Sequence, residues 1–171
     1  MHIGGFQKNS LIDFPGTIAC VVFTMGCNFI CPYCHNPELA AGPANGPGRL
    51  DTTDIFSFLT ARKGLVDGMV ITGGEPCLQP DLMDFIQHIK QMGIAVKLDT
   101  NGSRPAVLSG LLDRSLVDYV AMDIKTGADK YPEIMKPAAD MDAVLQSIRL
   151  IMDSAPAYEF RTTCVRPFIN A

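Results

Sequence analysis

The chain has 171 residues, of which 47% are hydrophobic and 19% are charged, and its net charge is −4 at pH 7. This composition predicts a soluble globular protein of one domain with a sizeable core. The absence of a basic stripe argues against a nucleic-acid partner. The longest apolar run, residues 18–23, is too short to span a bilayer, and the N-terminus shows no secretory signal. We therefore expect a cytoplasmic protein without membrane contacts.

Strand and helix patterns alternate along the chain. Residues 3–16 are expected to be extended and to end in a turn at Pro15-Gly16. Apolar runs predict buried strands, and apolar residues at helical spacing predict the helices between them. The expected strands cover residues 18–24, 68–72, 94–98, 117–122 and 158–165, and the expected helices cover residues 52–63, 80–92, 105–112 and 141–153. Residues 42–48, rich in glycine and proline, are expected to form a loop.

The order of these elements predicts an α/β fold. Repeated strand–helix–strand units favour a parallel sheet with right-handed crossovers. Polar clusters follow the strands at ends that share one edge of such a sheet, as in barrel enzymes that build their sites from the loops after the strands. Because five strands cannot close an eight-stranded barrel, we expect an open, partial TIM-like β/α barrel.

Three cysteines, Cys27, Cys31 and Cys34, lie within eight residues directly after the first expected strand. Thiolates this close can surround a metal centre. A 4Fe–4S cluster is usually held by four cysteines, so three would leave one iron open to bind another group. The alternative is a zinc knuckle that uses the adjacent His35 as a fourth ligand.

The other three cysteines, Cys20, Cys77 and Cys164, are scattered singly beside apolar stretches. In a cytosolic chain, cysteines point to metal or redox chemistry rather than to disulfides. With no local spacing to suggest a second metal site, we expect these three to be small buried side chains.

Polar residues also follow three further strands. These residues are Gly73, Gly74, Glu75 and Pro76, then Asp99, Thr100 and Asn101, then Asp123 and Lys125. The two glycines would let a ligand approach the backbone, although they could also form only a tight turn. Asp99 and Asp123 could likewise be ordinary loop caps. Their common position beside the cysteine loop favours one shared site.

The cysteine spacing, with Tyr33 just before the last cysteine, resembles the cluster loop of the radical S-adenosylmethionine (radical SAM) superfamily. The Gly-Gly-Glu-Pro stretch at residues 73–76 resembles the family's motif for the methionyl amino group. The resemblance implies a 4Fe–4S cluster whose open iron is chelated by the amino nitrogen and carboxylate of S-adenosylmethionine. One electron from the cluster then breaks the C5′–S bond and gives a 5′-deoxyadenosyl radical.

Within this superfamily the chain is most similar to glycyl-radical-enzyme activases. Asp99 to Gly102 and the pair Asp123 and Lys125 match their motifs. The resemblance implies that the two aspartates help hold a monovalent cation and that the lysine faces the cofactor. Arg161 could contact the cofactor's carboxylate or form an ion pair with Glu159.

The opening residues 5–16 and residues 35–38 resemble anaerobic ribonucleoside-triphosphate reductase activating proteins. This implies a glycyl radical enzyme, anaerobic ribonucleotide reductase, as partner, and flavodoxin or ferredoxin as electron donor. The resemblance covers residues 1–171 as one radical SAM core domain. Family members continue into a sixth strand and a helix, so we expect a C-terminally short core with an unpaired edge strand.

Two other functions fit the same residues. A radical SAM enzyme could act on a small-molecule substrate, although the compact chain shows no extra substrate domain. A zinc-stabilised α/β binding module would use the cysteine loop without catalysis.

Overall fold

The computed structural model describes residues 1–42, 50–136 and 140–166. These residues form an open six-stranded sheet in the order β1-β2-β3-β4-β5-β6. Strands β2 to β6 are parallel, whereas β1 pairs with β2 antiparallel. The strands are β1 (Ile3–Ser10), β2 (Ala19–Thr24), β3 (Gly68–Gly73), β4 (Ala95–Thr100), β5 (Tyr119–Asp123) and β6 (Tyr158–Arg161).

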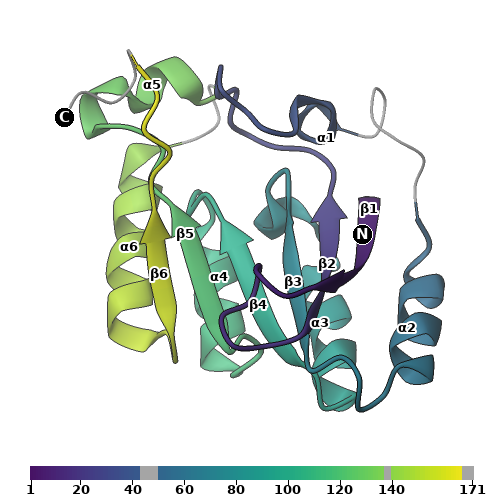
Figure 1. Ribbon diagram of the computed structural model, residues 1–171. Coiled ribbons are helices and arrows are strands. Elements are labelled where there is room, and N and C mark those ends of the chain that lie inside the picture. The colour runs from purple at the N-terminus through teal and green to yellow at the C-terminus, as the bar shows by residue number, and fades with distance from the viewer. Residues whose placement is uncertain (43–49, 137–139, 167–171) are drawn as a thin grey trace.

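Four long helices cover one face of this sheet, and two short helices lie beyond the carboxyl ends of its strands (Figure 1). The α-helices are α1 (Pro37–Ala41), α2 (Thr52–Ala61), α3 (Leu82–Gln91), α4 (Pro105–Asp113), α5 (Tyr131–Ile134) and α6 (Met141–Ser154), and short 3₁₀ turns are η1 (Pro76–Leu78) and η2 (Ala128–Lys130). Helices α2, α3, α4 and α6 contribute to one core cluster with the sheet. In Figure 1, α1 and α5 lie beyond the carboxyl ends of the strands.

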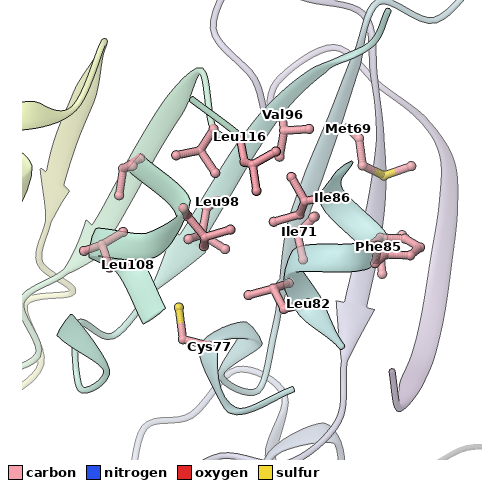
Figure 2. Packing of buried hydrophobic residues seen from close by; sticks show 14 of the residues in the cluster. Met69, Ile71, Cys77, Leu82, Phe85, Ile86, Val96, Leu98, Leu108 and Leu116 are labelled. Carbon is pink, nitrogen blue, oxygen red and sulfur yellow. The ribbon is translucent and has the colours of Figure 1, made fainter. Parts of the chain in front are cut away.

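The main core lies between the sheet and these four helices. Ile71 and Leu98 come from the central strands, and Ile86 and Leu108 come from the helices that cover them (Figure 2). All four side chains are buried. They recur at alternate positions of the strands and at helical spacing in the helices, so the apolar pattern of the sequence places them on this face.

A second, smaller cluster lies on the opposite face of the sheet, which we call the inner face. Phe14, in the connection between β1 and β2, packs there against Val21 and Val70. The rings of Phe14 and Tyr119 meet edge to face at 6.0 Å between centroids. This cluster closes the inner face at the amino ends of the strands and leaves the carboxyl ends for other groups.

The structure confirms the predicted open α/β sheet, its five parallel strands and the four long helices between them. The prediction missed that residues 3–10 form a sheet strand, and an antiparallel one. With Gly4, Gly5 and three exposed polar residues, β1 lacks an apolar run, and only pairing with β2 makes it a strand. Helices α1 and α5 were not predicted because both are too short for helical periodicity.

Several predicted boundaries shift by a few residues. Strand β4 extends through Asp99 and Thr100, so these residues lie in the strand and not in the loop after it. Strand β6 ends at Arg161 rather than at residue 165, because its partner β5 ends at the paired residue Asp123. Helix α3 begins at Leu82 rather than near residue 80.

The single cysteines are not all buried. Cys20 and Cys77 are buried as predicted, but Cys164 is exposed, because it follows the end of β6 and no helix or strand among the described residues covers it. Most of the loop predicted at residues 42–48, and the end of the chain from residue 167, lie outside the described residues. In the described part of the chain, no helix is long and apolar enough to cross a membrane.

Candidate radical SAM site

A cavity of about 670 Å³ opens at the edge of the sheet where the parallel strands end. Its size lies in the range of small-molecule sites, roughly 300–1,000 Å³. Most of the predicted site residues line it, namely Cys27, Cys31, Tyr33, Cys34, Gly73, Gly74, Asp99, Thr100, Asn101, Asp123 and Lys125. Three predicted residues, Glu75, Pro76 and Arg161, do not line it.

The cysteine loop forms one wall of the cavity. Cys27 and Cys31 are partly buried and Cys34 is exposed, and the amide of Cys34 donates to the carbonyl of Cys31 at 3.0 Å. Burial raises the pKa of the Cys27 thiol to about 11 and also raises the pKa of Cys31. The thiolates that bind metals are therefore disfavoured here until a positive centre compensates for lost solvation.

The three cysteines line the same cavity, but their thiols do not meet at one point. In the described part of the chain, no three His, Cys, Asp or Glu side chains converge closely enough to hold a single metal ion. A cubane cluster presents a different iron to each cysteine, so its ligands surround a volume. The donor set and its spacing fit three corners of such a cluster.

Gly73 and Gly74 line the cavity and also join two strand ends. A Cβ on Gly73, whose φ is +117°, would lie 2.3 Å from the backbone nitrogen of Thr24, and one on Gly74 would lie 2.1 Å from the carbonyl oxygen of Gly26. The Gly74 amide donates to the Thr24 carbonyl at 2.8 Å. The glycines are therefore required first by the close packing of the ends of β2 and β3, a reason that the sequence did not reveal.

The carboxylate of Glu75 does not line the cavity and is bonded to donors of the protein itself. The side chain is fully buried and accepts hydrogen bonds from the amides of Cys77 (3.0 Å) and Asn101 (2.7 Å) and from the Thr100 hydroxyl (2.7 Å). Burial raises its pKa, although these donors act in the opposite direction. Because its oxygens are engaged inside the protein, Glu75 fixes the ends of β3 and β4 to each other. Pro76 is buried beside it at the start of η1.

Asn101 carries this network to the cysteine loop. Its side-chain nitrogen donates to the Asn28 side-chain oxygen at 3.1 Å and lies 3.8 Å from the sulfur of Cys27. Asn28 in turn donates to the Ser103 hydroxyl at 2.8 Å. The buried carboxylate of Glu75 is thus linked, through neutral groups, to the first cysteine.

Charged side chains occupy the other side of the site on the inner face of the sheet. Ion pairs link five side chains in a row across β4, β6, β5 and the residues just after β5. These are Lys97, Asp99, Arg161, Asp123 and Lys125, and we call this set the ion-pair chain. Burial alone would lower the pKa of Arg161, but attraction to Asp99 and Asp123 outweighs it and raises the pKa. The pKa of Lys125 is also raised, because attraction to Asp123 outweighs the burial that would lower it.

Sequence reasoning missed several residues of this site. Lys136 donates from its ammonium group to the carbonyl of Cys27 at 2.6 Å across 109 residues. The buried hydroxyl of Tyr131, on α5, accepts from the amide of Lys125 at 3.1 Å, and the Tyr33 hydroxyl donates to the carbonyl of Lys125. No motif signals Lys136 or Tyr131, because their partners are set by the fold of residues 128–136.

Comparison with known proteins identifies the class. The family model described as the radical SAM superfamily matches residues 21–165. The chain therefore belongs to the radical SAM superfamily. Membership of this family implies a 4Fe–4S cluster and S-adenosylmethionine. Among solved structures, anSMEcpe with bound AdoMet matches 80% of this chain and 41% of its own, with a TM-score of 0.60 and 17% identity. This likeness supports the fold.

Curated relatives narrow the class. Over 168 residues the chain is 35% identical to a Methanocaldococcus jannaschii protein named as a glycyl-radical enzyme activating enzyme, covering 98% of this chain and 68% of that protein. It is 34% identical to the pyruvate formate-lyase-activating enzyme of Clostridium pasteurianum, covering 72% of this chain and 52% of the relative. A Halobacterium salinarum protein named as a GTP 3′,8-cyclase is 34% identical over 80% of this chain and 39% of its own length.

Proposed function

We propose that this chain is the radical SAM core of an activase that makes a glycyl radical on a partner enzyme. The observation that carries the proposal is a single cavity lined by three cysteines of one loop, a lysine and two aspartates. The similarity to a glycyl-radical enzyme activating enzyme over nearly the whole chain supports it. Those relatives extend beyond the part that this chain covers, so the activity of the whole protein is part of the proposal.

Cys27, Cys31 and Cys34 would hold a 4Fe–4S cluster with one iron open to S-adenosylmethionine. When bound and reduced by one electron, these groups supply a 5′-deoxyadenosyl radical and methionine, and the radical takes a hydrogen atom from a glycine of the partner. The protein's own contribution at this wall is to place three thiols on the cavity and to bury Cys27, which limits water at the reacting groups.

The opposite wall would hold S-adenosylmethionine. Gly73 and Gly74 place backbone without a side chain on the cavity, where the methionyl amino group could approach it. Lys125 would donate to the methionyl carboxylate, since an ammonium group on the cavity wall is a strong partner for such an anion. Tyr33, Thr100 and Asn101 complete the lining. Glu75, Pro76 and Arg161 do not line the cavity, and their role would be to hold the lining residues in position.

The partner and the electron donor belong to the same proposal. We infer a glycyl radical enzyme as partner, with anaerobic ribonucleotide reductase as the first candidate, because the opening segment and the residues after Cys34 resemble activating proteins of that reductase. A low-potential donor such as flavodoxin or ferredoxin would deliver the electron.

The test begins with protein reconstituted under anoxic conditions. We expect about four iron and four sulfide per chain, reductive cleavage of S-adenosylmethionine by dithionite, and a glycyl radical signal by electron paramagnetic resonance when the reductase is added. Protein that contains one zinc and no iron would instead support the zinc-stabilised binding module and overturn the proposal.

A second radical SAM function is favoured by one observation, the similarity to a protein named as a GTP 3′,8-cyclase. The same experiment separates the two. Cleavage of S-adenosylmethionine that never gives a glycyl radical on any candidate partner, but is stimulated by a small molecule, would favour a small-molecule substrate.

A further inference from the structure

The two aspartates at the site have no unpaired carboxylate oxygen. The oxygens of Asp99 accept from Lys97 at 2.6 Å and from Arg161 at 3.3 Å. Those of Asp123 accept from Arg161 at 2.9 Å and from Lys125 at 2.8 Å. Each of the four oxygens is therefore engaged by a cationic side chain of the protein itself.

The charges of this group also balance. Lys97, Arg161 and Lys125 bring three positive charges, and Asp99 and Asp123 bring two negative ones. The third negative charge comes from Glu159, whose carboxylate lies 3.8 Å from both Lys97 and Arg161. A further cation would add uncompensated charge to a partly buried group, which is costly where solvent is limited.

This arrangement does not fit the monovalent cation that the resemblance to activases implies. Such an ion needs several oxygen ligands around it. The carboxylate oxygens that the resemblance would offer it are already paired with cationic side chains. Arg161 occupies the position between the two carboxylates, and its guanidinium contacts both. We propose that in this protein Arg161 takes the place of the monovalent cation, so that the site is neutralised without a bound alkali ion.

The backbone explains why an arginine can do this reliably. Arg161 pairs with Asp123 in the parallel register of β5 and β6, and its carbonyl accepts from the amide of Ile124 at 2.8 Å. The guanidinium is planar, remains charged, and can donate in two directions at once. Because it is part of the chain, its local concentration does not depend on the salt present. Arg161 is thus a positioning residue that holds both aspartates, and through Asp123 it holds Lys125.

The first test uses the apoprotein and does not depend on the proposed function. Thermal unfolding is measured at equal ionic strength in tetramethylammonium, sodium and potassium chloride, since tetramethylammonium is too large to sit between the carboxylates. We expect the same Tm for the natural protein in all three salts. A Tm that is higher in sodium or potassium than in tetramethylammonium would overturn the proposal.

Variants at one position sharpen this test. Arg161→Gln leaves the two aspartates without their shared cation, so its Tm should be lowered in tetramethylammonium and raised again by sodium or potassium, by about 2–4 °C in a chain of this length. Arg161→Lys keeps a positive charge and should stay insensitive to the alkali ion. If the Tm of Arg161→Gln is the same in all three salts, no cation binds between Asp99 and Asp123 even without the arginine, and the proposed replacement is wrong. If that variant does not fold, the natural protein and Arg161→Lys still decide.

A second readout uses the reconstituted protein. The Kd for S-adenosylmethionine should be the same in the three salts for the natural protein, and should fall at least fivefold on adding potassium or sodium for Arg161→Gln. A natural protein whose Kd falls with potassium would contradict the proposal. Failure to bind S-adenosylmethionine in every salt would count against the proposed function, and the apoprotein measurement would then decide the role of Arg161 alone.

Discussion

The two faces of the sheet have opposite chemistry although the same strands build both. On β4, Val96 and Leu98 point to the helices and are buried among apolar side chains, while Lys97 and Asp99 point to the inner face and form ion pairs. Alternation of side chains along a strand separates the two sets without any change in the backbone. One face therefore stabilises the fold, and the other arranges polar groups.

The inner face itself divides along the strands. Its amino end is apolar, with Phe14 packed on Val21 and Val70. Its carboxyl end carries the ion-pair chain and opens into the cavity with the cysteine loop. The difference shows that charged groups can be partly buried on the inner face because they neutralise one another. In the described part of the chain the helix-covered face is apolar, so it has no buried charge to compensate. Four variants test this contrast, from the largest expected effect to the smallest.

The largest effect is expected on the cavity wall. Cys31→Ala should abolish cluster binding, because two thiolates do not hold a cubane that needs three. Iron and sulfide analysis after anoxic reconstitution measures this. Cys164→Ala is the matched control, since Cys164 is exposed and does not line the cavity, and it should keep its full iron content. Unchanged iron in Cys31→Ala would remove that residue from the proposed site.

On the helix-covered face, Leu98→Ala should lower the free energy of unfolding by about 4 kcal/mol. The change deletes a fully buried side chain and leaves a cavity in a close-packed core. Urea unfolding of the apoprotein measures it. Leu65→Ala removes an exposed leucine, 61% accessible, and should change the free energy by less than about 0.5 kcal/mol.

On the inner face, Asp99→Asn should cost about 3 kcal/mol, because it leaves the ammonium of Lys97, only 2% exposed, without its closest anion. The carboxylate of Glu159, 3.8 Å from the ammonium of Lys97, limits the loss of stability. Breaking the more accessible pair of Lys90 and Asp118, whose side chains are 27% and 39% exposed, with Lys90→Ala should cost less than about 1 kcal/mol, although the two charged groups lie a similar 2.7 Å apart. Equal effects of the two variants in urea unfolding would refute the claim that burial makes the difference.

The smallest effect is expected for Glu75→Gln, at about 2 kcal/mol of unfolding free energy. The amide nitrogen of glutamine would face one of three donors that now bond to the carboxylate, so one hydrogen bond is lost in a buried site. The exposed Glu38→Gln is the control and should be neutral within about 0.5 kcal/mol. A stability of Glu75→Gln equal to that of the natural protein would show that the network does not fix the strand ends.

Much of the fold could be predicted because its signals are local. The apolar run of β3 and the helical spacing of α3 were enough to find both elements, and the cysteine spacing was enough to suggest the cluster loop. Strand β1 could not be found in this way, because nothing in its composition distinguishes it from an extended loop. Its hydrogen bonds go to β2, and that pairing exists only in the folded chain.

The candidate site shows the same limit at the level of single side chains. The sequence suggested Glu75 and Arg161 as site residues and offered an ion pair with Glu159 as one possible contact of Arg161. That ion pair is present at 3.8 Å, but the closer contacts of both residues carried no signal. The carboxylate of Glu75 turns inward to three donors, and the guanidinium of Arg161 lies between two carboxylates. Lys136, which reaches the carbonyl of Cys27, carried no signal at all.

The amino-acid sequence by itself determined the alternation of strands and helices, the positions of the buried strands, and the spacing of three thiols on one loop. These properties depend on the period of the backbone and on residues close together in the chain. The tertiary structure decided which charges meet, which glycines are needed for close packing, and which carboxylate is buried. These contacts join residues on different strands, where every donor and acceptor has several possible partners and only the assembled sheet selects among them.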